Sequence, residues 1–243
     1  MNLALAGLSY GVTIFALILL AVQSRKLIAI FKTGQPDPTR SNNKPQRLRM
    51  MLGEVFGHTK MLNFTVVGFA HWFVMVSFFG LFGTLVTAYG QLINPYFIIP
   101  VIGHFWVYEY ITELLAWTTG IAIVALIGIR QVTLRTNKRS RFAGSGNWKA
   151  YYVEATVLAV VFCVIALRGL EGALSDETAW NRHFITTWFI ADMFKSMSLS
   201  QITSWIQIVA TIKIVTSMLW FVVLAANLTM GITWHRFLAP FNI

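Results

Sequence analysis

The chain has 243 residues, of which 56% are hydrophobic and only 12% are charged, and its mean hydropathy is +0.65. This balance excludes a soluble globular domain and predicts an integral membrane protein. The net charge of +10 does not indicate nucleic-acid binding, because basic residues of membrane proteins gather in cytoplasmic loops. The single cysteine, Cys163, lies in an apolar run, so the chain has no internal disulfide and no iron–sulfur or zinc spacing.

Five apolar segments are long enough to cross a bilayer, which takes about 20 helical residues. They predict transmembrane helices over approximately residues 3–22, 61–88, 106–129, 151–167 and 202–235. The first segment lacks a preceding basic region and a small-residue cleavage site, so we expect a retained anchor rather than a signal peptide. The predicted fold is all-α and integral to the membrane: a five-transmembrane-helix bundle that forms a single domain over residues 1–243.

Basic residues between the helices predict the orientation of the bundle. Residues 23–60 carry eight Lys or Arg and residues 130–149 carry six, together fourteen of the nineteen in the chain. The positive-inside rule assigns both connections to the cytoplasm, which leaves the N-terminus outside and the C-terminus cytoplasmic. Three prolines in residues 23–60 favour a loop there. Because the chain stops soon after its last helix, we expect a cytoplasmic domain to follow Ile243.

Two histidines mark the cytoplasmic ends of the second and fifth helices. His58 precedes Lys60 at the end of one helix, and His235 lies between Trp234 and Arg236 at the end of the other. Imidazoles from different helices at one depth are the arrangement that haem b with two axial histidines requires. The alternative is that both side chains are interfacial and solvated by lipid headgroups.

A third histidine, His71, lies within the second helix. It follows His58 by thirteen residues, which places it about 20 Å further along a continuous helix and roughly 140° around it. This separation suits two stacked haems, but no other predicted helix has a histidine at this depth, and Met218 and Cys163 are the nearest sulfur ligands. In a second interpretation His71 pairs with His235, and in a third it is bonded to a helix carbonyl.

Charged residues within the spans indicate proton or quinone chemistry near the outer side of the bundle. Glu109 and Glu113 share one helix face at an i, i+4 spacing, and His104 lies in the outer connection before them. Lys213 in the fifth helix must reach the interface or pair, and one of these glutamates is the expected partner. The alternative is that the glutamates are interfacial with no chemical role. We expect His183, in a polar outer connection, to be solvated.

Several segments resemble known membrane proteins. GFAHWF (68–73) and TWHRFLAP (233–240), in a bundle of five spans, resemble the cytochrome b or gamma subunit of respiratory nitrate reductase. With WKAYYVE (148–154), LRGLE (167–171) and residues 230–240, the whole chain is more similar to the membrane domain of heterodisulfide-reductase-like iron–sulfur oxidoreductases. Within that group it resembles the electron-transfer flavoprotein:menaquinone oxidoreductases.

This resemblance implies haem b held by histidines of the bundle, at the matching positions His58, His71 and His235. It also implies a menaquinone site in a bacterial plasma membrane and a cytoplasmic module with iron–sulfur clusters. The nitrate reductase subunit has two ligating histidines on its fifth helix, whereas this chain has Ser217 near the second position, so one or two haems are expected. Electrons would pass from electron-transfer flavoprotein through iron–sulfur clusters and haem b to menaquinone, with the outer polar residues supplying protons.

Two other classes of function remain open. A haem-free membrane anchor for an iron–sulfur oxidoreductase would need none of the histidines. A small proton or ion transporter would use Glu109, Glu113 and Lys213 as its path, although the sequence shows no inverted repeat and no broken helix pair. The expected partners are the iron–sulfur domain or subunit, the flavoprotein, membrane lipid and quinone, with no nucleic acid.

Overall fold

The computed structural model of the chain describes residues 2–35, 37, 39, 42–136 and 147–241. These residues form helices and turns, with no β-strand among them. The long helices are α1 (Leu3–Phe31), α6 (Trp106–Thr136), α7 (Asn147–Leu174) and α9 (Leu199–Ala226), with a bent pair, α4 (Thr65–Gly80) and α5 (Phe82–Ile93). The short helices are α2 (Lys44–Val55), α3 (Thr59–Leu62), α8 (Trp188–Phe194) and α10 (Gly231–Leu238), followed by a 3-10 turn at Ala239–Phe241.

The long helices make this a multi-pass membrane protein. α1, α6, α7 and α9 are each long and apolar enough to cross a membrane, and α4 with α5 makes a fifth span if the pair is counted as one. Large apolar side chains such as Phe15, Phe162 and Ile121 are exposed on the bundle surface, as expected for helices that face lipid. The prediction of an all-α membrane bundle is confirmed at this level.

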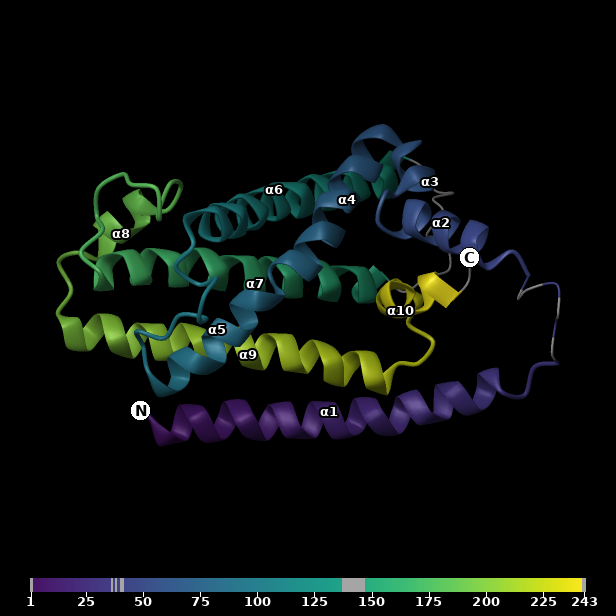
Figure 1. Ribbon diagram of the computed structural model, residues 1–243, viewed down its shortest axis with the longest axis horizontal. Helices are drawn as coiled ribbons and strands as arrows, with labels where there is room; N and C mark the ends of the chain where they lie inside the picture. The colour runs from purple at the N-terminus through teal and green to yellow at the C-terminus, as the bar shows by residue number, and fades with distance from the viewer. Residues whose placement is uncertain (1, 36, 38, 40–41, 137–146, 242–243) are drawn as a thin grey trace.

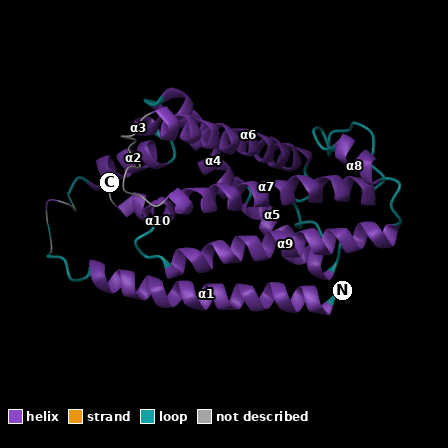
Figure 2. Ribbon diagram, turned by 180° about the vertical axis from the view of Figure 1, so that it is seen from behind, coloured by secondary structure: helices purple, strands orange, loops and turns teal. Residues whose placement is uncertain are grey.

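The long helices run side by side along the long axis of the molecule (Figure 1). One end, here called the α8 end, carries α8, the start of α1 and the connection between α5 and α6. The other end, here called the α10 end, carries α2, α3 and α10, and the view from behind shows the same grouping (Figure 2). Functional residues gather at both ends.

Helix α9 is the centre of the bundle, because it packs against α1, α5 and α7. Its buried residues Ile206, Ala210, Ile214 and Met218 recur every four positions and form one apolar stripe. Helix α4 packs against α6 instead. The bent pair therefore crosses the bundle diagonally, from α6 near the α10 end to α9 near the α8 end (Figure 1).

The bend between α4 and α5 is 41° and falls at Leu81. Gly80, just before it, approaches α6 so closely that a Cβ atom would lie 2.5 Å from Leu115 Cδ1. Ser77, one turn earlier, donates a hydrogen bond to the Leu115 carbonyl (3.3 Å). These contacts hold the end of α4 against α6. They set the point at which the chain turns away from α6. The segment 61–88, which was predicted as one helix, is therefore bent within the bundle.

Several predicted helix bounds also change. The segment 61–88 is divided among α3, α4 and α5, and the segment 202–235 is divided between α9 and α10. The helices predicted over 3–22, 106–129 and 151–167 are each several residues longer in the structure. Residues 23–60, predicted as a loop, include the end of α1 and all of α2, where Pro45 occupies the first turn and breaks no helical hydrogen bond. Most of the second basic connection, residues 137–146, lies outside the described residues.

Candidate functional site

Three histidines meet at the α10 end and form what we call the histidine cluster: His58, His71 and His235. His58 Nε2 and His71 Nδ1 are 3.0 Å apart, and their rings are stacked with centroids 5.2 Å apart. The His71 and His235 rings have centroids 6.0 Å apart and planes tilted by 43°. The predicted separation of about 20 Å between His58 and His71 is wrong, because the helix that it assumed is not continuous.

A reversal of the chain before α4 brings His58 back to His71. His58 has a left-handed φ of 51° at the start of α3, and Thr65 has a φ of 35° at the start of α4. Gly68 lets the two helices touch, since a Cβ there would lie 2.0 Å from the Met61 carbonyl oxygen. Trp72 Nε1 donates to the Phe56 carbonyl (3.1 Å) and holds the turn against α4.

The third histidine is positioned by its neighbour in the sequence. Trp234 is buried, and its Nε1 donates to the carbonyls of Leu224 and Asn227, each at 3.2 Å. These carbonyls belong to the end of α9, so the indole ties α10 to the end of the central helix. His235, the next residue, is exposed and turns towards His71.

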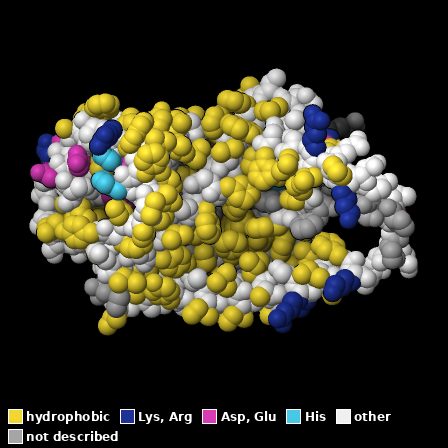
Figure 3. All heavy atoms as spheres, in the orientation of Figure 1, with side chains coloured by type: hydrophobic (Ala, Val, Ile, Leu, Met, Phe, Trp, Pro, Cys, Tyr) yellow, Lys and Arg dark blue, Asp and Glu magenta, His cyan; other side chains and the backbone are white. Residues whose placement is uncertain are grey.

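An apolar cavity of about 370 Å³ opens between α4, α5, α7 and α9, and none of the three histidines is among the described residues that line it. Val74 and Phe78 line the cavity. They follow His71 by three and seven residues, so they lie on the same face of α4 as His71. Phe237 of α10 lines it two residues after His235. The volume lies within the range of small-molecule sites, and Figure 3 shows a hollow in the apolar face of the bundle. The remaining walls come mainly from α7 and α9.

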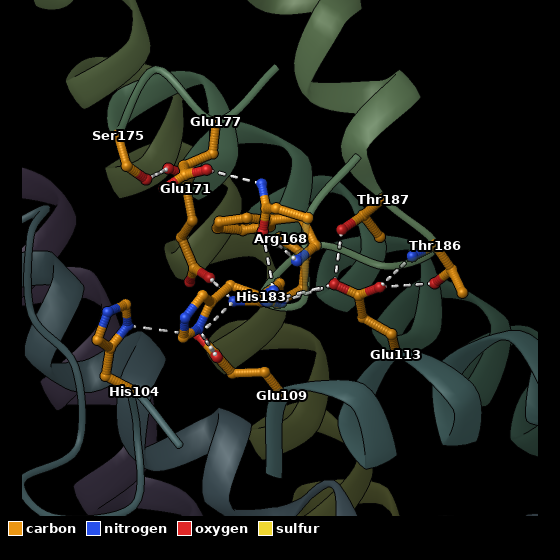
Figure 4. A network of polar contacts seen from close by, with 12 residues as sticks. His104, Glu109, Glu113, Arg168, Glu171, Ser175, Glu177, His183, Thr186 and Thr187 are labelled. Carbon is orange, nitrogen blue, oxygen red and sulfur yellow. Dashed lines mark hydrogen bonds and ion pairs between the residues drawn. The ribbon is translucent and has the colours of Figure 1, made fainter. Parts of the chain in front are cut away.

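A second polar group, the arginine–carboxylate network, lies at the α8 end (Figure 4). Its centre is Arg168 on α7, which lies 2.8 Å from Glu171, 3.2 Å from Glu113 and 3.6 Å from Glu109. Arg168 also donates to the His183 carbonyl and lies 4.3 Å above the Phe184 ring. Glu109 and Glu113 are buried in α6. Buried carboxylates need such partners, because desolvation of an isolated charge is costly.

Glu113 is the most fully satisfied of the three carboxylates. Its Oε2 accepts from the backbone N–H and the hydroxyl of Thr186, both at 2.7 Å, and its Oε1 accepts from Thr187 Oγ1 at 2.7 Å. It therefore ties the connection before α8 to α6. Glu113 is therefore buried rather than interfacial, and its chemical role stays a prediction.

His183 is part of this network rather than solvated, contrary to the prediction. Its Nδ1 lies 2.6 Å from Glu109 Oε2, and its side chain is 18% exposed. His104 stacks on it with ring centroids 4.5 Å apart and planes within 10°. Sequence reasoning also missed Arg168 and Glu171, which it placed in a connection. A possible signal was their spacing of three residues directly after an apolar run.

Lys213 lies deep in α9, with 1% of its surface exposed. Its Nζ donates to the carbonyl and the hydroxyl of Thr84, at 2.8 and 2.7 Å, rather than to the predicted glutamate. The side chain lines the apolar cavity and also a small polar cavity of about 40 Å³, which Glu109, Arg168 and Glu171 line as well. The small cavity is large enough for water. Lys213 thus lies between the two cavities.

Gln91 adds a further polar atom to the small cavity. Its Nε2 donates to Glu171 Oε1 at 2.6 Å, and its Oε1 is buried without a hydrogen-bond partner among the described residues. Buried polar atoms of this kind are commonly satisfied by water. The structure thus brings the predicted outer residues into one polar region, with Lys213 at its inner limit.

No known family model matches the chain, and no characterised protein or solved structure matches it either.

Proposed function

We propose that the protein is a membrane electron-transfer module that passes electrons between a cytoplasmic iron–sulfur or flavoprotein partner and menaquinone through haem b. The observation that carries this proposal is that the rings of His71 and His235, which come from two different helices, lie with their centroids 6.0 Å apart at the α10 end. These two residues would hold the haem iron. When bound, haem b with two histidine ligands supplies a one-electron carrier without an open coordination position.

The hydrogen bonds of the cluster support His71 rather than His58 as a ligand. The Val55 carbonyl can only accept, so His58 Nδ1 donates to it at 2.9 Å. In neutral imidazoles, His58 Nε2 then accepts from His71 Nδ1, which leaves the lone pair on His71 Nε2. Metal-bound histidines almost always donate their other N–H to a fixed partner. His58 is therefore assigned as the positioning residue of His71.

The distribution of charge supports the proposed orientation. Arg25 and Lys26 lie near the end of α1, and Lys44, Arg47 and Arg49 lie on α2, all towards the α10 end. Figure 3 shows Lys and Arg side chains gathered at this end of the visible face. The positive-inside rule then makes the α10 end cytoplasmic, in a bacterial plasma membrane as the sequence resemblance implies. The haem would lie close to a cytoplasmic iron–sulfur partner.

The proposed menaquinone substrate requires two protons together with two electrons. Lys213 lines the apolar cavity, where a quinone ring fits, and its other side lines the polar cavity. The water-sized polar cavity, which Glu171 also lines, extends from Lys213 towards the α8 end. We assign Lys213 as the group that passes protons to the quinone oxygens, with the polar cavity as its proton supply. Glu113 positions the loop before α8.

Replacing Lys213 with methionine tests the proton route. The change keeps the length of the side chain and removes its proton, so haem binding is expected to persist while quinone reduction slows by roughly 100-fold. The measurement is the rate at which a menaquinone analogue oxidises the dithionite-reduced protein. Lys195→Met is the matched control, because this exposed lysine pairs only with Asp192 on α8 among its described ion pairs. An unchanged rate in Lys213→Met would rule out the assignment.

The proposed function itself is tested by the reduced-minus-oxidised visible spectrum of the purified full chain, followed by a pyridine haemochrome assay. We expect a b-type spectrum and one haem per chain, because the three histidines of the cluster share one location. Protein that takes up no haem when haem is abundant would instead be an anchor for an iron–sulfur oxidoreductase.

The positioning role of His58 gives a separate expectation. His58→Ala should retain the haem but bind it about 10- to 100-fold more weakly, because loss of such an outer partner has this typical effect. The measurement is haem dissociation to an excess of apomyoglobin, with His104→Ala at the α8 end as the control. Complete loss of haem in His58→Ala would show that His58 is itself a ligand.

The transporter alternative gains one observation from the bent pair α4–α5. Transporters with inverted repeats have such breaks in corresponding helices of both halves. Among the described residues, α4 with α5 is the one bent helix pair that is long and apolar enough to cross a membrane. The cytochrome proposal accounts for the histidine cluster as well, and for this reason we favour it.

A further inference from the structure

The α8 end contains three potential metal ligands. The proposed electron path does not require a metal ion there. His104 lies in the connection between α5 and α6, Glu109 in the first turn of α6, and His183 in the connection between α7 and α8. One ligand atom from each residue lies within 4.8 Å of the other two. His104 and Glu109 are five residues apart, whereas His183 follows Glu109 by 74 residues, and Figure 4 shows the three side by side.

The two imidazoles converge on one carboxylate. His183 Nδ1 lies 2.6 Å from Glu109 Oε2, and His104 Nδ1 lies 3.7 Å from Glu109 Oε1. Donors around a tetrahedral zinc ion with bonds of 2.0–2.2 Å lie roughly 3 to 4 Å apart. The side chain of His104 is 69% exposed, so its ring has room to turn towards an ion.

The charges of the network also favour a cation. Glu109, Glu113 and Glu171 carry three negative charges, and Arg168, which contacts all three, carries one positive charge. These four side chains have a net formal charge of −2, and Arg182, 3.3 Å from His183 Nε2, adds one positive charge beside them. Arg168 lies 3.6 Å from Glu109 Oε1 and helps to hold this carboxylate in place. Such outer contacts are typical of metal-ligating carboxylates.

We propose that His104, Glu109 and His183 bind a divalent transition-metal ion at the α8 end. Two imidazoles and one carboxylate suit Zn²⁺ and leave one coordination position for water. The ion joins the connection before α6 to the connection before α8. This site is independent of the histidine cluster, which lies at the other end of the bundle.

The test is a calorimetric titration of the purified full chain with Zn²⁺ after treatment with EDTA. We expect one saturable site per chain at the α8 end, weakened at least about tenfold in His104→Ala and in His183→Ala. His104 is exposed, so its replacement leaves the fold intact. A rise of the melting temperature on addition of Zn²⁺, absent in both variants, is the second expected readout.

Two control variants distinguish this site from zinc binding elsewhere on the chain. Arg182→Ala removes a contact at 3.3 Å to His183 Nε2 and a positive charge but no ligand atom, so it should bind Zn²⁺ at least as tightly as the wild type. His58→Ala should leave this binding unchanged. Equal affinity in His104→Ala, His183→Ala and the wild type would overturn the proposal. So would loss of the site in His58→Ala, because the ion would then belong to the histidine cluster.

Discussion

Replacing His235 with alanine is expected to abolish the b-type spectrum, and His71→Ala is expected to do the same. In the proposed function His71 and His235 would be the two protein ligands of haem b, so the loss of either would leave the iron with one protein ligand. His235 is exposed on α10, and Trp234 rather than His235 holds that helix against α9. The variant should therefore fold. The measurement is haem per chain after purification, together with the reduced-minus-oxidised spectrum.

The control for these variants is His183→Ala, which removes a histidine at the opposite end of the bundle. It should retain the full haem content and an unchanged spectrum. If His235→Ala keeps its haem, the assigned ligand pair is wrong. If all variants and the wild type lack haem under haem-replete expression, the electron-transfer proposal fails as a whole.

Replacing Arg168 with methionine is expected to cost about 3–5 kcal/mol of folding stability, the usual effect of removing one partner from a buried charge group. Arg168 contacts three carboxylates and the His183 carbonyl. Without it, three negative charges remain in a region with little access to water. The measurement is thermal unfolding in detergent micelles, where the variant should melt well below the wild type.

A matched control for Arg168→Met is Arg130→Met, since Arg130 forms a pair with Glu154 between the same two helices. Its effect should be smaller, because it leaves one carboxylate rather than three. Glu113→Gln in the Arg168→Met background should restore part of the lost stability by removing one charge. Equal melting temperatures for Arg168→Met and the wild type would show that the network does not stabilise the fold.

The helical class and the number of apolar segments could be predicted because membrane spans need long apolar runs. The position of His58 could not. The prediction assumed one helix through residues 58–71, whereas His58 and Thr65 adopt left-handed backbone conformations, which are uncommon for residues other than glycine. A predicted distance of about 20 Å thereby becomes a contact of 3.0 Å.

The network at the α8 end shows a different limit of sequence reasoning. Arg168 and Glu171 appeared to mark the end of a span, because charged residues usually stop a hydrophobic run. In the structure they lie within α7, where the glutamates of α6 compensate Arg168. Such compensation depends on which helices are neighbours, and a single sequence does not contain that information. The proximity of Glu109 and Glu113 along one helix face was predictable from their spacing alone.

The crossing of the bent pair has a consequence for how a ligand reaches the apolar cavity. Phe79 and Phe82 line the cavity and are largely exposed on the surface that faces lipid. A lipid-soluble molecule can therefore enter sideways from the bilayer without passing through water. Its occupancy then follows its mole fraction in the membrane rather than its aqueous concentration. Affinities measured in bilayers of different quinone content should agree only when they are expressed per lipid.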